Sequence, residues 1–192
     1  MIPTLPLRPR NRLAETILGA LHDPRARAEL DALAQASADR PPSGWLTTDD
    51  ARHTDLLVAR ARRAAEALGR IPPGRLHTSL EETLPSAATL FDAGLYFEVH
   101  ELLEPDWRQA AGEAREALQG LIQIAVGYQH LTNGNVPGAE ALLAEGAGRL
   151  AHGRLPRFDF ARFARAVLAS REWLHAIDTA DVPRFPHASS EQ

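Results

Sequence analysis

The chain has 192 residues, of which 44% are hydrophobic and 24% charged, a composition typical of a soluble globular protein of one domain or one domain with an N-terminal extension. It contains no Cys, which excludes disulfides, thiol catalysis and thiolate metal sites. The net charge of −4 and the lack of an apolar run of roughly 18 residues indicate neither a nucleic-acid nor a membrane partner, so we predict a cytoplasmic protein.

The first part of the chain predicts three helices. Apolar residues repeat at helical spacing from Leu13 and stop near Pro24, and residues 24–38 form an Ala-rich second segment. A third helix follows the N-cap candidates at 47–49 and runs to about Gly69. Its outer face carries several Arg mixed with acidic residues, which we interpret as a solvated face and not as a nucleic-acid surface. Pro and Gly at 69–75 mark a boundary, and we assign residues 1–80 to an N-terminal helical extension.

The rest of the chain predicts an antiparallel helical bundle, so the expected fold class is all-α. We expect a helical core domain over residues 81–180 and a disordered tail over residues 181–192. The core helices are expected near residues 85–91, 96–107 and 113–132, then from Pro137 onward and around Phe160 to Leu174. Gly146 and neighbouring Ala residues let another helix approach closely, and such small-residue faces would also allow a homodimer.

The segment YFEVHELLEPDW, residues 96–107, carries ionisable groups within an apolar helix. On a helical projection four residues lie within about 60° of His100. They are Tyr96, Phe97, Glu104 and Trp107. Glu101 falls to the side and Glu98 on the far side. Because a face with bulky aromatics is usually buried, we expect His100 and Glu104 to be buried with it. Pro105 cannot donate to the carbonyl of Glu101, so it predicts a kink or an end of the helix.

A second polar stripe follows the helix at 113–132. Gln119, Gln123 and His130 share one side of it among Leu and Ile residues. Buried polar groups need hydrogen-bond partners, so the two stripes are expected to face each other. We therefore predict a buried site in which His100 and Glu104 meet Gln119 and Gln123 across the helix pair.

Three interpretations of this site stay open. His100 and Glu104 have the i, i+4 spacing of a metal-binding helix, and the third ligand would come from Glu101 or His130. Alternatively, the stripe lines a pocket for a small ligand, with His100 or Glu104 as the candidate catalytic group. In the third interpretation the network only fixes the register of the helices. Neither the cofactor nor the reaction, if there is one, follows from the residues.

Three ordered motifs resemble one known family. The first is F-x-x-G-x-Y-F-x-x-H-E-x-x-E-x-x-W from Phe91 to Trp107, the second is L-Q-G-L-I-Q-x-A from Leu118 to Ala125, and the third is H-x-x-x-G-N-x-x-G-A from His130 to Ala139. Together they resemble the domain-of-unknown-function 309 family. The resemblance implies a small all-helical domain over roughly residues 84–178 and assigns no activity.

Overall fold

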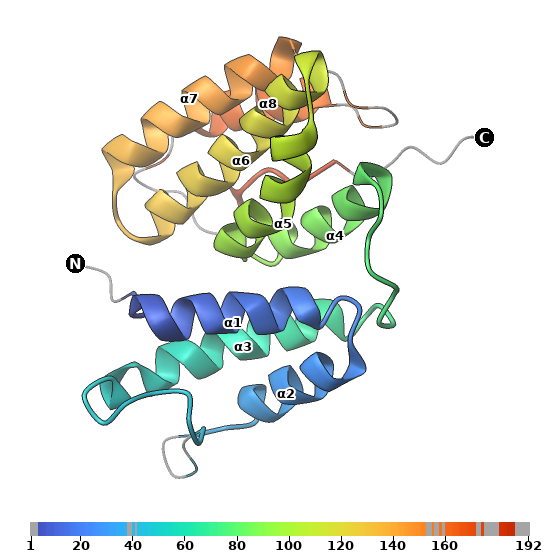
Figure 1. Ribbon diagram of the computed structural model, residues 1–192. Coiled ribbons are helices and arrows are strands. Elements are labelled where there is room, and N and C mark those ends of the chain that lie inside the picture. The colour runs from blue at the N-terminus through green and yellow to red at the C-terminus, as the bar shows by residue number, and fades with distance from the viewer. Residues whose placement is uncertain are drawn as a thin grey trace. The chain divides into compact units, whose positions relative to one another are not determined.

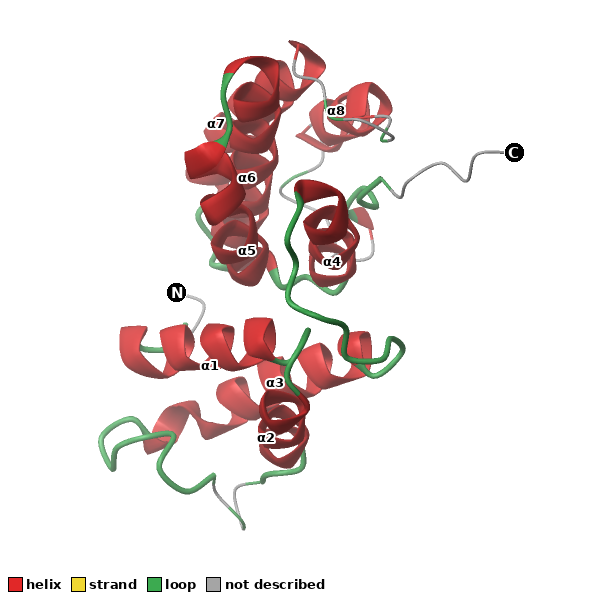
Figure 2. Ribbon diagram, turned by 45° about the vertical axis from the view of Figure 1, so that its right-hand side comes forward, coloured by secondary structure: helices red, strands yellow, loops and turns green. Residues whose placement is uncertain are grey.

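The computed structural model describes residues 4–37, 40, 42–152, 155, 158, 160–171, 174 and 181–186. These residues form eight α-helices and one short 3-10 helix and contain no strand, which confirms the predicted all-α class (Figure 1, Figure 2). The chain divides into two compact units, residues 2–77 and residues 78–192. Each unit has its own apolar core.

The N-terminal unit contains three α-helices that pack against one another, α1 (Leu7–Gly19), α2 (Pro24–Ala34) and α3 (Thr54–Leu68), with the 3-10 helix η1 (Ala51–His53) before α3. Asp23 caps α2, because its Oδ1 accepts a hydrogen bond of 2.8 Å from the backbone N–H of Arg25. The core side chains are apolar and fully buried; among them are Leu13, Ile17, Leu30, Leu57, Ala61 and Leu68.

Arg27 connects the ends of two helices in this unit. Its Nε donates to the carbonyl of Ala20 at 3.0 Å, just after α1, and its Nη1 donates to the carbonyl of Leu68 at 2.7 Å, at the last residue of α3. Both carbonyls belong to helix C-termini, where acceptors lack intrahelical partners and the helix dipole favours a cation. The Arg27 side chain, on α2, thereby links the C-terminal ends of α1 and α3 by hydrogen bonds.

The C-terminal unit contains the remaining helices, α4 (Leu80–Asp92), α5 (Tyr96–Gln109), α6 (Gly112–Thr132), α7 (Val136–His152) and α8 (Phe160–Ser170). Each helix packs against the next one in the chain, with short connections between α4 and α7. Figure 1 shows α6 at the centre of this unit, between α5 and α7. The predicted bundle is therefore present.

Two helix boundaries differ from the sequence prediction, and both involve Pro. α4 begins at Leu80, five residues before the predicted start, and Pro85 lies inside it. The Glu82 carboxylate accepts a 2.8 Å bond from the backbone N–H of Thr78 and so supports this earlier start. α5 runs through Pro105 to Gln109, two residues past the expected span, so of the two expected effects of this proline, a kink or an end, the end does not occur. A proline removes one backbone donor, and the packing of α5 against α4 and α6 outweighs that loss.

α6 and α7 approach so closely that glycine is required at their contact. A Cβ on Gly120 would lie 2.7 Å from the carbonyl oxygen of Gly146, and a Cβ on Gly146 would lie 2.8 Å from that of Gly120. Gly127 has the same role beside Leu143, whose Cγ would lie 2.9 Å from an added Cβ. The close helix approach predicted from Gly146 is thus observed within the unit.

An aromatic cluster forms the core of the C-terminal unit. The ring of Phe91 contacts four others with centroid distances of 5.2–5.8 Å; they are Tyr96, Tyr128, Phe163 and Phe185. Phe185 is 2% exposed, and its backbone N–H donates to Asp92 Oδ1 at 2.9 Å. The sequence placed residues 181–192 in a disordered tail, but residues 181–186 pack onto the unit through Phe185. Residues 187–192 lie outside the described residues.

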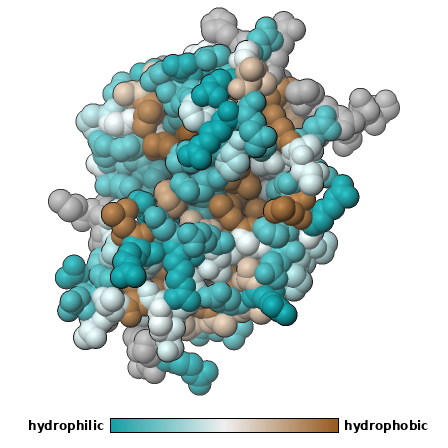
Figure 3. All heavy atoms as spheres, in the orientation of Figure 1, coloured by the Kyte–Doolittle hydropathy of each residue, from teal (hydrophilic) through white to brown (hydrophobic). Residues whose placement is uncertain are grey.

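The surface is mainly polar on the face drawn in Figure 3, where apolar side chains appear in small separate areas. Four large apolar side chains of the described residues are exposed: Leu7, Ile71, Leu76 and Leu168. They belong to α1, to the segment between α3 and α4, and to α8. Within the described part of the chain, no helix combines the length and the apolar character that crossing a bilayer requires.

Candidate functional site

The buried face of α5 is not centred where the sequence placed it. Val99 and Leu103 are fully buried and Tyr96 is 2% exposed, so the centre of this face lies roughly 70° around the helix from His100. His100 and Glu104 lie on one flank of the face and retain side-chain exposures of 30% and 29%. The predicted full burial of this pair is wrong. Tyr96, Phe97 and Trp107 suggested a single aromatic face, but only Tyr96 reaches the core.

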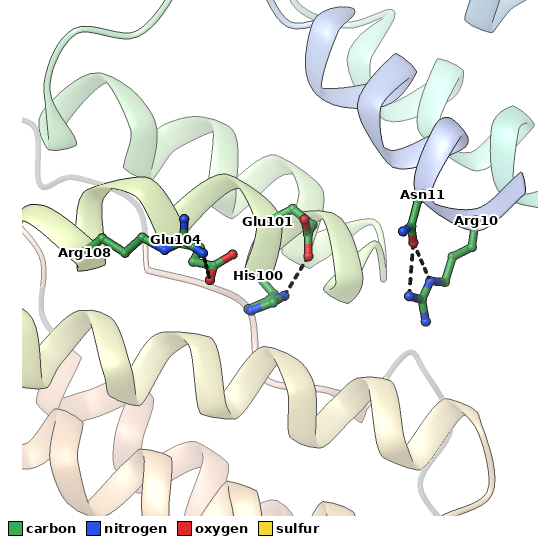
Figure 4. A network of polar contacts seen from close by, with 6 residues as sticks. All are labelled: Arg10, Asn11, His100, Glu101, Glu104 and Arg108. Carbon is green, nitrogen blue, oxygen red and sulfur yellow. Dashed lines mark hydrogen bonds and ion pairs between the residues drawn. The ribbon is translucent and has the colours of Figure 1, made fainter. Parts of the chain in front are cut away.

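Three ligand-type side chains converge on this flank of α5. His100 Nδ1 lies 3.0 Å from Glu101 Oε1, and one ligand atom from each of His100, Glu101 and Glu104 lies within 4.8 Å of the others. Glu104 Oε1 also accepts a 2.7 Å ion-pair bond from Arg108 Nη2, one helical turn further on. Figure 4 shows all four side chains on α5, with Arg108 reaching back to Glu104. We call His100, Glu101 and Glu104 the α5 cluster.

The polar residues of α6 do not join the α5 cluster. Within the part of the chain that the structure describes, no hydrogen bond connects Gln119 or Gln123 to His100 or Glu104. Gln123 interacts instead with α7, where its side-chain amide is the main influence that lowers the pKa of the Glu145 carboxyl. His130 Nδ1 pairs with Asn135 Nδ2 at 2.7 Å, beside the start of α7.

The two remaining predicted site residues have different surroundings. Tyr96 belongs to the aromatic core and packs against Phe91 and Tyr128. Trp107 is half-buried, and the guanidinium of Arg115 lies 4.1 Å from the centre of its ring. Its Nε1 is buried and has no hydrogen-bond partner in the described residues, and the same is true of Gln123 Oε1.

Two charged residues of α5 were missed or misplaced by the sequence analysis. Glu98, expected to face outward, has an exposure of 0%. Because α5 packs against both α4 and α6, it is covered on more than one side, and a single projected face could not reveal this. Arg108 was not considered, although its i, i+4 spacing from Glu104 is the usual signal for an ion pair within a helix.

The α5 cluster offers one imidazole nitrogen and two carboxylate oxygens, a ligand set that suits Zn²⁺ and other divalent transition metals. Ligand atoms around such an ion are about 3–4 Å apart, given metal–ligand bonds of roughly 2.0–2.2 Å. The observed limit of 4.8 Å requires only small side-chain rotations to reach this range. In the same unit, a shallow cavity of about 600 Å³ is lined by Gly112, Arg115 and Arg149 among others, and none of the α5 cluster takes part in it.

Fold and site together define a small helical domain that presents a His–Glu–Glu cluster on one helix. Residues 84–142 match the model of the family described as Domain of unknown function (DUF309), which confirms the family resemblance drawn from the three motifs. The matched segment includes α5, the α5 cluster and all of α6, and it leaves the N-terminal unit outside. No curated protein and no solved structure matches the chain.

Proposed function

We propose that the C-terminal unit binds one divalent metal ion through His100, Glu101 and Glu104. The observation that carries this proposal is the convergence of their three ligand atoms within 4.8 Å. Three ligands from one helix leave further coordination positions open, as in catalytic metal sites. The exposures of 29–38% leave the cluster accessible to solvent and to small solutes.

The contacts of the cluster argue against a purely structural role. The His100–Glu101 and Glu104–Arg108 contacts each join residues of the same helix. Contacts within one helix cannot fix the register between two helices. Exposed pairs of this kind are worth only about 0.2–1 kcal/mol, so they contribute little to the stability of the fold.

A small-ligand pocket built from both polar stripes has less support. It would require Gln119 and Gln123 to face His100 and Glu104, whereas Gln123 interacts with Glu145 of α7. The small-ligand interpretation is retained only in a restricted form, in which a small ligand binds at the open coordination positions of the metal.

The test is a calorimetric titration, in which Mn²⁺ or Zn²⁺ is added to the full chain and the heat of binding is measured. The wild type is expected to bind one ion per chain, and Glu104→Gln should weaken this binding at least tenfold because it removes an anionic ligand. Glu145→Gln is the matched control, since Glu145 is also paired with an Arg at i, i+4 but lies on α7.

Equal binding by Glu104→Gln and the wild type would refute the α5 cluster as the metal site. A wild type that binds no ion would refute metal binding altogether. A loss caused equally by Glu145→Gln would indicate a general effect of charge on the protein and would also contradict the proposal.

A further inference from the structure

Arg108 occupies the position of a cation at the α5 cluster. Its Nη2 lies 2.7 Å from Glu104 Oε1, and its side chain is 67% exposed while that of Glu104 is 29% exposed (Figure 4). A metal ion that uses the Glu104 carboxylate as a ligand would compete with this guanidinium. Because the ion pair is largely exposed, its separation has a small energetic cost.

The charge of the cluster changes sign when the metal binds. The carboxylates of Glu101 and Glu104 and the guanidinium of Arg108 contribute a sum of −1. A divalent ion changes this sum to +1. A cationic site with open coordination positions attracts anions.

Arg108 would remain next to the metal after leaving Glu104, because both residues belong to the same stretch of α5. Its planar guanidinium carries five N–H donors, whose arrangement matches two oxygens of a phosphate or carboxylate group. The Arg108 guanidinium therefore supplies hydrogen-bond donors beside the metal position.

We infer that the metal-loaded α5 cluster binds an oxyanion, a phosphate or carboxylate group of a small molecule, and that Arg108 moves from Glu104 to this anion. The inference rests on the proposed metal site and extends it to a substrate class. It implies an order of binding, since the metal-free cluster is anionic and repels the ligand that the metal-loaded cluster attracts.

The test uses the full chain, with Mn²⁺ as the metal and inorganic phosphate as the anion. Phosphate is titrated into metal-free and Mn²⁺-loaded protein and followed by calorimetry, with a Mn²⁺–phosphate titration without protein as the blank. The variant is Arg108→Gln, and Arg165→Gln on α8 is the control for the loss of one exposed positive charge.

The expected result is a pair of opposite effects. Arg108→Gln should bind Mn²⁺ about two- to tenfold more tightly, because a competing cation is gone. The same variant should bind phosphate about tenfold more weakly or worse in the metal-loaded state, because it loses charge-assisted hydrogen bonds. Arg165→Gln should leave both affinities within about twofold of the wild type.

Other results overturn the inference in distinguishable ways. If Mn²⁺ binds but phosphate binding is the same with and without metal, or is unchanged in Arg108→Gln, the anion site is refuted and the metal site stands. If the wild type binds no Mn²⁺, the proposed function fails and the inference fails with it.

Discussion

Gly146 provides the sharpest test of how the C-terminal unit is packed. Replacing it with Ala places a Cβ 2.8 Å from the carbonyl oxygen of Gly120 and 3.0 Å from Ile124 Cγ1. The first neighbour is backbone, so α6 and α7 would have to separate. Such overpacking costs about 1–3 kcal/mol, whereas an Ala in place of Gly inside a helix gains about 1 kcal/mol.

Gly148→Ala is the matched control on the same helix, because a Cβ there meets nothing within 4 Å. Both substitutions gain the same helix propensity, so the difference between them isolates the packing effect. We expect Gly148→Ala to raise the unfolding free energy by about 1 kcal/mol and Gly146→Ala to fall about 1–3 kcal/mol below it. Denaturant unfolding followed by circular dichroism measures both. Equal stability of the two variants would refute the close approach of α6 and α7.

Three further predictions concern the packing and titration of the two units. Arg27→Ala should lower the unfolding free energy by about 2–4 kcal/mol, measured by denaturant unfolding, because it leaves two helix-end carbonyls without a charged donor; a loss below 1 kcal/mol would contradict this role. Phe185→Ala should cost about 3–5 kcal/mol, measured in the same way, and a neutral result would show that residues 181–186 do not pack as described. Burial raises the pKa of Tyr128 to about 12 in the folded protein, despite its hydroxyl contact with Ser170. Folding keeps the Tyr128 hydroxyl protonated. Its contribution to the unfolding free energy is therefore intact below about pH 10 and decreases by about 1.4 kcal/mol per pH unit between about pH 10 and about pH 12. Tyr128→Phe should flatten this alkaline decline in an unfolding series against pH, and an unchanged slope would contradict the assignment.

The fold class and most helices followed from apolar periodicity, because amphipathic helices bury one side whatever their partners are. The start of α4 five residues before Pro85 and the continuation of α5 past Pro105 did not. Proline disfavours a helix interior locally, but tertiary packing of α4 and α5 outweighs that local preference. The ordered segment around Phe185 was also missed, since a single aromatic residue flanked by prolines and an arginine gives no periodic signal.

The candidate site was predicted in part. In one of three open interpretations, His100 and Glu104 were candidate metal ligands with either Glu101 or His130 as the third; the structure brings Glu101 close to them and leaves His130 beside Asn135. The predicted burial of His100 and Glu104 and their contact with α6 were wrong, because a helical projection fixes the relative angles of side chains but not which angle faces the core. Gln123 turns to Glu145, a partner on α7 that only the packing of α6 and α7 could reveal. The cytoplasmic location and the homodimer remain predictions from the sequence.

The most direct test of the central claim is an anomalous difference map from crystals of the full chain soaked with Mn²⁺ or Zn²⁺. We predict one strong peak on α5, about 2.0–2.2 Å from an imidazole nitrogen of His100 and from carboxylate oxygens of Glu101 and Glu104, with the Arg108 guanidinium displaced from Glu104. Soaked crystals without a peak at these three residues, or with Arg108 still bound to Glu104 beside an empty cluster, would contradict the account.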